Sequence, residues 1–328
     1  MAPWLQRQLN HLMNQSGHAW LLQGPSGLGQ FELAYELAKT WLCENPSEMG
    51  ACGKCKSCHS FEVHTHADFM ALIPEAVALE RSWPLTETVQ KELADKKRKP
   101  SKDIRVESAR DMVQFSQRTA SSARGKVVLV FPAERMNHIT ANALLKTLEE
   151  PPAGFRFVLA TGAGDDLLPT IKSRCLSHRL EFPLQDEAMA WLQTQGLNST
   201  DARVLLKASG SRPFDALELI HRGLSAQTWS HFPQAVFDGE MSFFKAFTGP
   251  DLIDALQRLC HDLMSLAVGA EPRYFSVNHL QSFQQGLKLN RLAAWSKQLI
   301  EAAKTAEHPF KLDLMQEAAI SQAQKFIQ

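Results

Sequence analysis

The chain has 328 residues, of which 44% are hydrophobic and 21% charged, as in a soluble globular protein of two or three domains. Its 35 basic and 35 acidic residues balance, which argues against tight, independent binding to nucleic acid. Because the N-terminus lacks a signal-peptide pattern and no apolar run is long enough to span a membrane, we expect a cytoplasmic protein without membrane contact.

Short apolar runs rich in β-branched or aromatic residues alternate with helical patterns in the first half of the chain. They predict strands at residues 18–23, 69–73, 127–131, 156–161 and 178–182. Such apolar runs are typical of strands that are covered on both faces. Strands that alternate with helices predict an α/β fold with a mostly parallel sheet.

A phosphate-loop pattern follows the first predicted strand and precedes a predicted helix. The stretch "GPSGLGQF" keeps Gly24, Gly27 and Gly29, glycines of the kind that let backbone N–H groups surround a phosphate. Gln30 stands where such loops carry lysine, and Phe31 stands where a hydroxyl holds Mg²⁺. The loop is therefore a degenerate one.

The acidic residues that organise Mg²⁺ in phosphate-loop ATPases are also missing. They are expected at the end of the strand at 127–131, where this chain has Phe131 and Pro132. We therefore expect no ATP hydrolysis by this chain, and weak nucleotide binding or none at Gly24, Gly27 and Gly29. Two interpretations stay open: a tight strand-to-helix connection, or a remnant nucleotide site that is occasionally occupied.

Four cysteines lie close together after the helix that follows this loop. Cys43, Cys52, Cys55 and Cys58 have the spacing C-x8-C-x2-C-x2-C, which suits a tetrahedral structural Zn²⁺ site. Disulfides are disfavoured because a cytoplasmic compartment is reducing. An iron–sulfur cluster is disfavoured because the ferredoxin continuation C-x3-C-P is absent. We predict a zinc module at residues 43–58.

Two further segments interrupt or follow the strand pattern. Residues 74–102 contain prolines and the basic cluster 96–99, and we expect a loop or partly helical surface excursion with a solvated charge run. A helix is expected after the third strand, with Thr140 as its N-cap and an end before Pro151. Beyond residue 183 the patterns are helical throughout.

Four features in combination resemble the AAA+ clamp loader family: the degenerate loop, the four-cysteine insertion, "NALLKTLEEPP" at 142–152 and "IKSRC" at 171–175. The resemblance covers most of the chain. It implies a RecA-like AAA+ α/β domain at 1–165, an all-α lid at 166–225 and an all-α collar at 226–328.

The resemblance also implies a function and partners. Members of the family form a pentameric ring of three ATPase subunits, a delta subunit and a stator-like subunit, which loads the sliding clamp on primed DNA. In the family's S-R-C motif the arginine is a finger that acts on a neighbour's ATP, and Arg174 matches it. The resemblance thus implies a non-catalytic subunit of a DNA polymerase holoenzyme. The alternative for Arg174 is a structural salt bridge.

Other classes of protein fit less well. An active ATPase subunit of the same loader is disfavoured by Gln30, Phe31, Phe131 and Pro132. A zinc-containing DNA-binding regulator on an α/β scaffold is disfavoured by the neutral net charge and by the lack of a basic helix beside the cysteines. A small-molecule phosphate-loop kinase would need the missing lysine.

Overall fold

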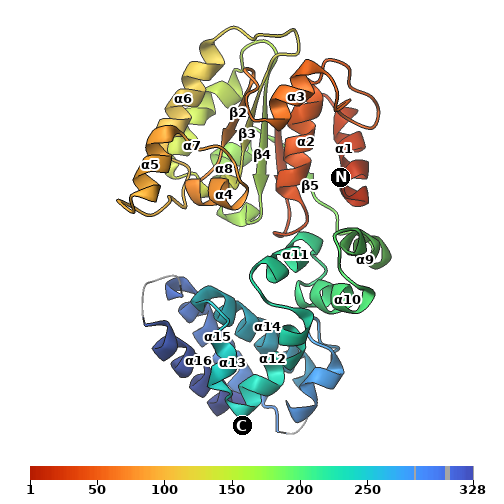
Figure 1. Cartoon of the computed structure of the whole chain (residues 1–328), viewed down its shortest axis with the longest axis vertical. Coiled ribbons are helices and arrows are strands. Elements are labelled where there is room, and N and C mark those ends of the chain that lie inside the picture. Colours follow the sequence, from red (N-terminus) through yellow and green to blue (C-terminus); the bar gives the residue numbers. More distant parts are fainter. Residues whose placement is uncertain (284–285, 307–310, 328) are drawn as a thin grey trace. The chain divides into compact units, whose positions relative to one another are not determined.

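The computed structural model describes residues 1–283, 286–306 and 311–327. The chain divides into two compact units, Met1–Phe182 and Pro183–Gln328, which we call the first and the second unit (Figure 1). Within the described ranges, no helix combines the length and the apolar character needed to cross a bilayer.

The first unit is built on a parallel sheet of five strands among its described residues, in the order β2-β3-β4-β1-β5. The strands are β1 (Ala19–Gln23), β2 (Phe69–Leu72), β3 (Lys126–Val130), β4 (Phe155–Thr161) and β5 (Leu176–Arg179). Every pairing is parallel, which confirms the predicted α/β class. Since β5 pairs with β1, the first unit continues past residue 165, where the sequence analysis placed its end.

The central strands owe their apolar sequences to burial on both faces. All five residues of β3 are buried, whereas β5 at the sheet edge is largely exposed. This exposure explains why β5 carries Ser177 and Arg179 and starts at Leu176, two residues before the predicted start. β2 at the other edge is only partly exposed and keeps an apolar run, whereas β5 is largely exposed, so its sequence lacks the apolar run by which the other strands were found.

Helices cover the sheet of the first unit (Figure 1). They are α1 (Pro3–Met13), α2 (Gln30–Leu42), α3 (Lys56–Glu62), α4 (Glu75–Glu80), α5 (Glu87–Ala94), α6 (Val106–Gln117), α7 (His138–Glu149) and α8 (Pro169–Lys172), with short 3-10 turns η1 (Ala133–Arg135) and η2 (Gly164–Asp166). Val128 and Val130 of β3 share a buried core with Leu144 and Leu148 of α7.

The predicted N-cap of α7 is wrong. Asn137 caps the helix, because its side chain accepts a hydrogen bond from the N–H of Thr140 at 2.8 Å. Thr140 instead lies inside the first turn, fully buried, and its hydroxyl donates to the carbonyl of Ile104 at 3.2 Å. Asn and Thr are both good N-cap residues, so the sequence alone does not decide which one caps α7. The contact of Thr140 with Ile104 places Thr140 inside the helix.

The excursion at 74–102 is partly helical, as predicted, with α4 and α5 inside it. Its centre is the buried carboxylate of Glu75, which Arg98 contacts with both Nη atoms, at 2.5 and 2.9 Å. The N–H of Ser101 donates to the same carboxylate at 2.9 Å, and Arg105 lies at 3.1 Å. The hydrogen bonds from Arg98 hold the pKa of Glu75 below its ordinary value of 4.5.

Replacing Glu75 with glutamine is expected to destabilise the first unit by about 2 kcal/mol, because charge-assisted hydrogen bonds to Arg98 are lost. The depressed pKa means that Glu75 contributes stability above pH 4.5, and that this contribution is lost as the pH falls below that value. Denaturant unfolding of wild type and variant at neutral pH and at about pH 3 measures it. An equal difference at both pH values would contradict the assignment.

The second unit is helical throughout its described residues. Its helices are α9 (Gln185–Thr194), α10 (Ser199–Ala208), α11 (Pro213–His221), α12 (Ala226–Asp238), α13 (Met241–Phe244), α14 (Gly249–Ala267), α15 (Leu289–Thr305) and α16 (Leu312–Ile327), with the 3-10 segment η3 (Val277–Phe283). Residues 284–285, 307–310 and 328 of the predicted collar lie outside the described residues. The division into 166–225 and 226–328 stays a prediction.

The core of the second unit is aromatic, and one buried acid orders the segment after α14. Trp229 and Phe232 of α12 and Trp295 of α15 are fully buried. Asp262 of α14, also fully buried, accepts hydrogen bonds from the backbone N–H groups of residues 273, 274 and 275 at 2.7 to 2.8 Å. A buried carboxylate with such donors fixes the backbone that follows the helix.

Candidate functional sites of the first unit

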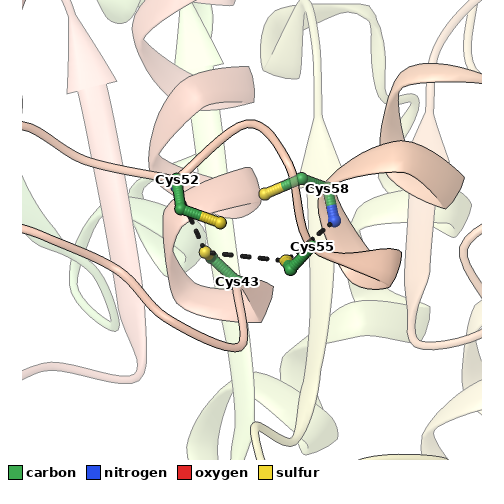
Figure 2. Close-up of side chains that lie close together, drawn as sticks. All are labelled: Cys43, Cys52, Cys55 and Cys58. Carbon is green, nitrogen blue, oxygen red and sulfur yellow. Dashed lines mark hydrogen bonds between the residues drawn. The ribbon is translucent and has the colours of Figure 1, made fainter.

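The four cysteines converge between α2 and α3 (Figure 2). Cys43 directly follows α2, and Cys55 is the N-cap of α3, whose sulfur accepts from the N–H of Cys58 at 3.4 Å. The four Sγ atoms all lie within 4.8 Å of one another. Cys43 and Cys55 have their sulfurs 3.9 Å apart, against about 3.8 Å for the edge of a tetrahedron with Zn–S bonds of about 2.3 Å. The cluster therefore fits a metal ion held by sulfur alone.

The environment of the sulfurs favours thiolate at one position and thiol at another. A hydrogen bond from the backbone of Lys54 lowers the pKa of Cys52 to about 6. Burial raises the pKa of Cys58 to about 12. Because metal binding requires every cysteine ligand to be deprotonated, an ion here must displace protons, and its affinity must rise with pH.

The nearby histidines are used elsewhere. His66 has its Nδ1 at 3.1 Å from the N–H of Asp68, from which it accepts, and its Nε2 at 2.8 Å from the hydroxyl of Ser57. The ring of His64 lies 4.0 Å from the ring of Trp83. His64 and His66 thus have packing or hydrogen-bonding roles, and the four sulfurs can complete a tetrahedral shell by themselves.

The degenerate phosphate loop is held in place by hydrogen bonds from a side chain of the same chain. Gly27 and Gly29 have φ values of 78° and 101°, which side chains disfavour. Gln30 is 4% exposed, and its amide Nε2 donates to the carbonyl of Gly24 at 2.8 Å and to that of Pro25. The residue that replaces the lysine therefore holds the loop by hydrogen bonds from within.

The residue that replaces the Mg²⁺ ligand joins an aromatic cluster. Phe31 is 7% exposed, and its ring lies 5.2 Å from Phe131 and 6.1 Å from Trp83. The guanidinium of Arg81 lies 4.0 Å from the centre of the Phe31 ring and binds Glu32 at 2.8 Å. Apolar rings under an arginine thus occupy the place that phosphate-loop enzymes give to metal ligands.

Arg81 and Trp83 are site residues that the sequence analysis missed. Both belong to the excursion at 74–102, whose role the sequence left open. The presence of Phe31 and Phe131 at positions that are usually polar was the available indication that other side chains pack there. Large apolar side chains at these two positions require burial, and the excursion at 74–102 provides it.

Replacing Phe31 with threonine, the residue type that binds Mg²⁺ in intact loops, is expected to destabilise the first unit by about 3 kcal/mol because a buried ring is lost. We expect no gain of ATP hydrolysis, since Phe131 and Pro132 supply no metal-binding carboxylate. Denaturant unfolding and a phosphate-release assay measure the two effects. Measurable hydrolysis by the purified variant would contradict this account of the site.

An open cleft of about 640 Å³ lies beside the loop, at the carboxyl ends of β1, β4 and β5. Its lining residues are Gln23, Gly24, Pro25, Gly162, Ala163, Gly164, Asp165, Asp166 and Arg179. Asp165 and Asp166 share this cleft with the loop and with Arg179, so the cleft presents both signs of charge to a phosphate.

Arg174 lies elsewhere, directly after α8. Its side chain is 31% exposed and forms an ion pair with Glu149, with the Nε–H donating to Oε1 at 2.7 Å. Its Nη1 donates to the carbonyl of Thr170 at 2.9 Å and to the hydroxyl of Ser173 at 3.2 Å. Among the described residues, no contact links Arg174 to the loop at 24–31. The structure thus joins the two motifs "NALLKTLEEPP" and "IKSRC" and leaves the degenerate loop apart from them.

A parallel α/β unit with a strand, a glycine loop and a helix in succession belongs to the nucleotide-binding class of scaffolds, here with an altered loop. A family model described as "DNA polymerase III, delta subunit" matches residues 3–183. The chain belongs to this family.

Several relatives carry the name of the same subunit. DNA polymerase III subunit delta' of Pseudomonas aeruginosa is 37% identical over 69% of this chain and 63% of its own length. The subunit delta' of Escherichia coli is 34% identical over 66% of this chain and 60% of its own length. In both relatives the matched region is less than two thirds of the protein. A DNA polymerase III gamma-subunit-related structure from Thermotoga maritima, 18% identical, covers 99% of this chain and 100% of its own with a TM-score of 0.48.

Proposed function

We propose that this chain is a delta-prime-type, stator-like subunit of the replicative clamp loader, with an AAA+ domain, a lid and a collar. Its partners are the ATPase subunits and the delta subunit, and through the assembled complex the sliding clamp and primed DNA. One observation carries the proposal: a phosphate loop with Gln30 and Phe31 in place of its lysine and its metal ligand stands in the same unit as a surface arginine, Arg174, which does not contact it among the described residues.

The altered loop supports a chain that does not hydrolyse ATP. Gln30 binds the loop carbonyls, and the rings of Phe31 and Phe131 lie where metal ligands are required. Phosphoryl transfer depends on neutralising the phosphate charge with a metal ion and a lysine. At the loop this chain has Gln30 in place of the lysine and Phe31 in place of the hydroxyl that binds the metal ion.

The position of Arg174 supports a finger that acts in trans. The guanidinium is partly exposed and lies in an open cleft of about 460 Å³ lined by His18, Leu148, Glu149, Ser173 and Arg174. A guanidinium keeps its charge at any physiological pH and donates along two edges, so it can stabilise charge on a γ-phosphate held by a neighbour.

The four-cysteine cluster supports a structural Zn²⁺ ion. Sulfur fills every position of the tetrahedron, which leaves no open site for a substrate or an attacking water. Because the cluster lies between α2 and α3, an ion bound there would stabilise the conformation of the segment that connects α2 to β2.

The alternative of an independent DNA-binding regulator receives less support. In the basic cluster of the excursion, Arg98 is bound to Glu75 and Glu92, and Lys97 is bound to Asp95. Paired charges of this kind contribute little to phosphate binding.

The experiment is reconstitution of the loader with this chain, the ATPase subunits and the delta subunit. ATP turnover with clamp and primed DNA is compared between wild type and Arg174→Ala, after size-exclusion chromatography has shown that both assemble. A large fall in turnover supports the finger. Equal turnover and equal clamp loading would reject it and leave a structural salt bridge.

A further inference from the structure

Arg174, in the motif at 171–175, is held by the carboxylate of Glu149, in the motif at 142–152. The Nε–H donates to Oε1 of Glu149 at 2.7 Å, and Nη2 contacts the same oxygen. Glu149 is the last residue of α7, and Arg174 directly follows α8 and Ser173. The pair therefore ties two helix ends at the mouth of the open cleft.

Most of the donors of this guanidinium are already engaged. Nη1 donates to the carbonyl of Thr170 and to the hydroxyl of Ser173, which accounts for both of its N–H bonds. Nε and Nη2 point to Glu149, which leaves one N–H of Nη2 without an acceptor among these contacts. A phosphate that binds the Nε and Nη2 edge of the guanidinium must take it from Glu149, and the Nη1 and Nη2 edge is occupied through Nη1 by Thr170 and Ser173.

We propose that Glu149 is the positioning residue of the finger: it holds Arg174 against its own chain and releases it to a triphosphate on a neighbouring subunit. This inference rests on the proposed function. The ion pair suits such an exchange because both partners are partly exposed, 31% for Arg174 and 49% for Glu149. Exposed pairs are weak enough for a multiply charged phosphate to displace them.

The carboxylate of Glu149 acts on the neighbour's nucleotide in two ways. It competes with the phosphate for Nε and Nη2, and it repels the phosphate charge across the same cleft. Both effects oppose binding of the nucleotide more than they oppose the chemical step, because the finger is already transferred when the transition state forms.

Glu149→Gln isolates the charge. Glutamine keeps the size of the side chain and an oxygen that accepts from Nε, and it removes the negative charge. We expect KM for ATP at the neighbouring site to fall by about threefold to fivefold, the range of one weak exposed ion pair. kcat should stay within about twofold. The difference in KM should shrink at high salt, since exposed charges are screened.

Glu150→Gln is the matched control. Glu150 is the next residue, is exposed, and has no ion pair among the described residues. The substitution changes the net charge by the same amount one position away. If Glu149 acts through Arg174, the control leaves KM at the wild-type value.

A second measurement uses the isolated full chain. In arginine Nε–H NMR spectra, the Arg174 resonance is identified by its loss in Arg174→Lys. Glu149→Gln should speed exchange of this proton with water, and Glu150→Gln should leave it unchanged. This reports the ion pair without any neighbouring subunit.

The two measurements separate the possible failures. Faster proton exchange together with a lower KM for Glu149→Gln supports the proposal. Faster exchange with unchanged KM, while Arg174→Ala still abolishes turnover, overturns the positioning role and leaves the finger intact. If Arg174→Ala itself has no effect on turnover, the finger and its positioning residue are rejected together, and the NMR result shows that the pair is structural.

Discussion

Arg174→Ala is expected to lower ATP turnover at the neighbouring site by about 10³-fold, the usual worth of an arginine finger. The physical reason is that the γ-phosphate gains charge-assisted hydrogen bonds only when the guanidinium arrives from this chain. Intact sites elsewhere in the ring would mask part of the loss, so single-turnover measurement with the neighbour's site as the slow step is the suitable assay.

Two control variants sharpen this result. Arg174→Lys keeps the charge but loses the planar fork, and we expect it to recover only a small part of the activity. Arg110→Ala removes an exposed arginine of α6 in the same unit, and we expect wild-type turnover. A comparable loss in Arg110→Ala would show that the assay reports net charge and not the finger.

Cys55→Ser is expected to remove the metal from the four-cysteine site and to destabilise the first unit by about 4 kcal/mol, as the loss of a structural metal does. The sulfur of Cys55 belongs to the four-cysteine cluster and also caps α3 by accepting from the N–H of Cys58. The serine hydroxyl can replace the cap but is a poor zinc ligand, so the variant separates metal binding from capping.

Metal content by mass spectrometry and unfolding by denaturant measure this prediction. Wild type should contain about one zinc per chain, and a chelator should bring its stability close to that of the variant. Cys175→Ser is the control, because Cys175 is a free thiol outside the cluster. Full zinc content in Cys55→Ser would contradict the assigned ligand set.

The sequence predicted the strands well because parallel, doubly covered strands leave apolar runs. Four predicted strands agree with the structure to within about one residue at either end. The prediction of β5 was displaced because this strand, unlike the apolar edge strand β2, is largely exposed and carries polar residues. The N-cap of α7 was misplaced because Asn137 and Thr140 are both suitable caps, and only the contact of Thr140 with Ile104 decides between them.

The candidate sites also differ in how far the sequence predicts them. The sulfur cluster was predictable because its ligands are close in sequence and short spacings bring them together. The cover of the phosphate loop was not predictable, since Arg81 and Trp83 reach Phe31 across some fifty residues of chain. The pairing of Arg174 with Glu149 was likewise hidden, because it depends on how the ends of two helices meet.

The hydrogen bonds of Gln30 have a consequence for the response of this unit to nucleotide in the proposed clamp loader. A ligand stabilises a protein in proportion to the logarithm of its concentration over its dissociation constant. In this chain the groups that hold the loop are covalently attached, so their effective concentration never changes. If these contacts exclude nucleotide, as we propose, the first unit should melt at the same temperature with ATP, with ADP or with neither. In the proposed clamp loader, the loop of this unit would keep one conformation whatever nucleotide the neighbouring subunits hold.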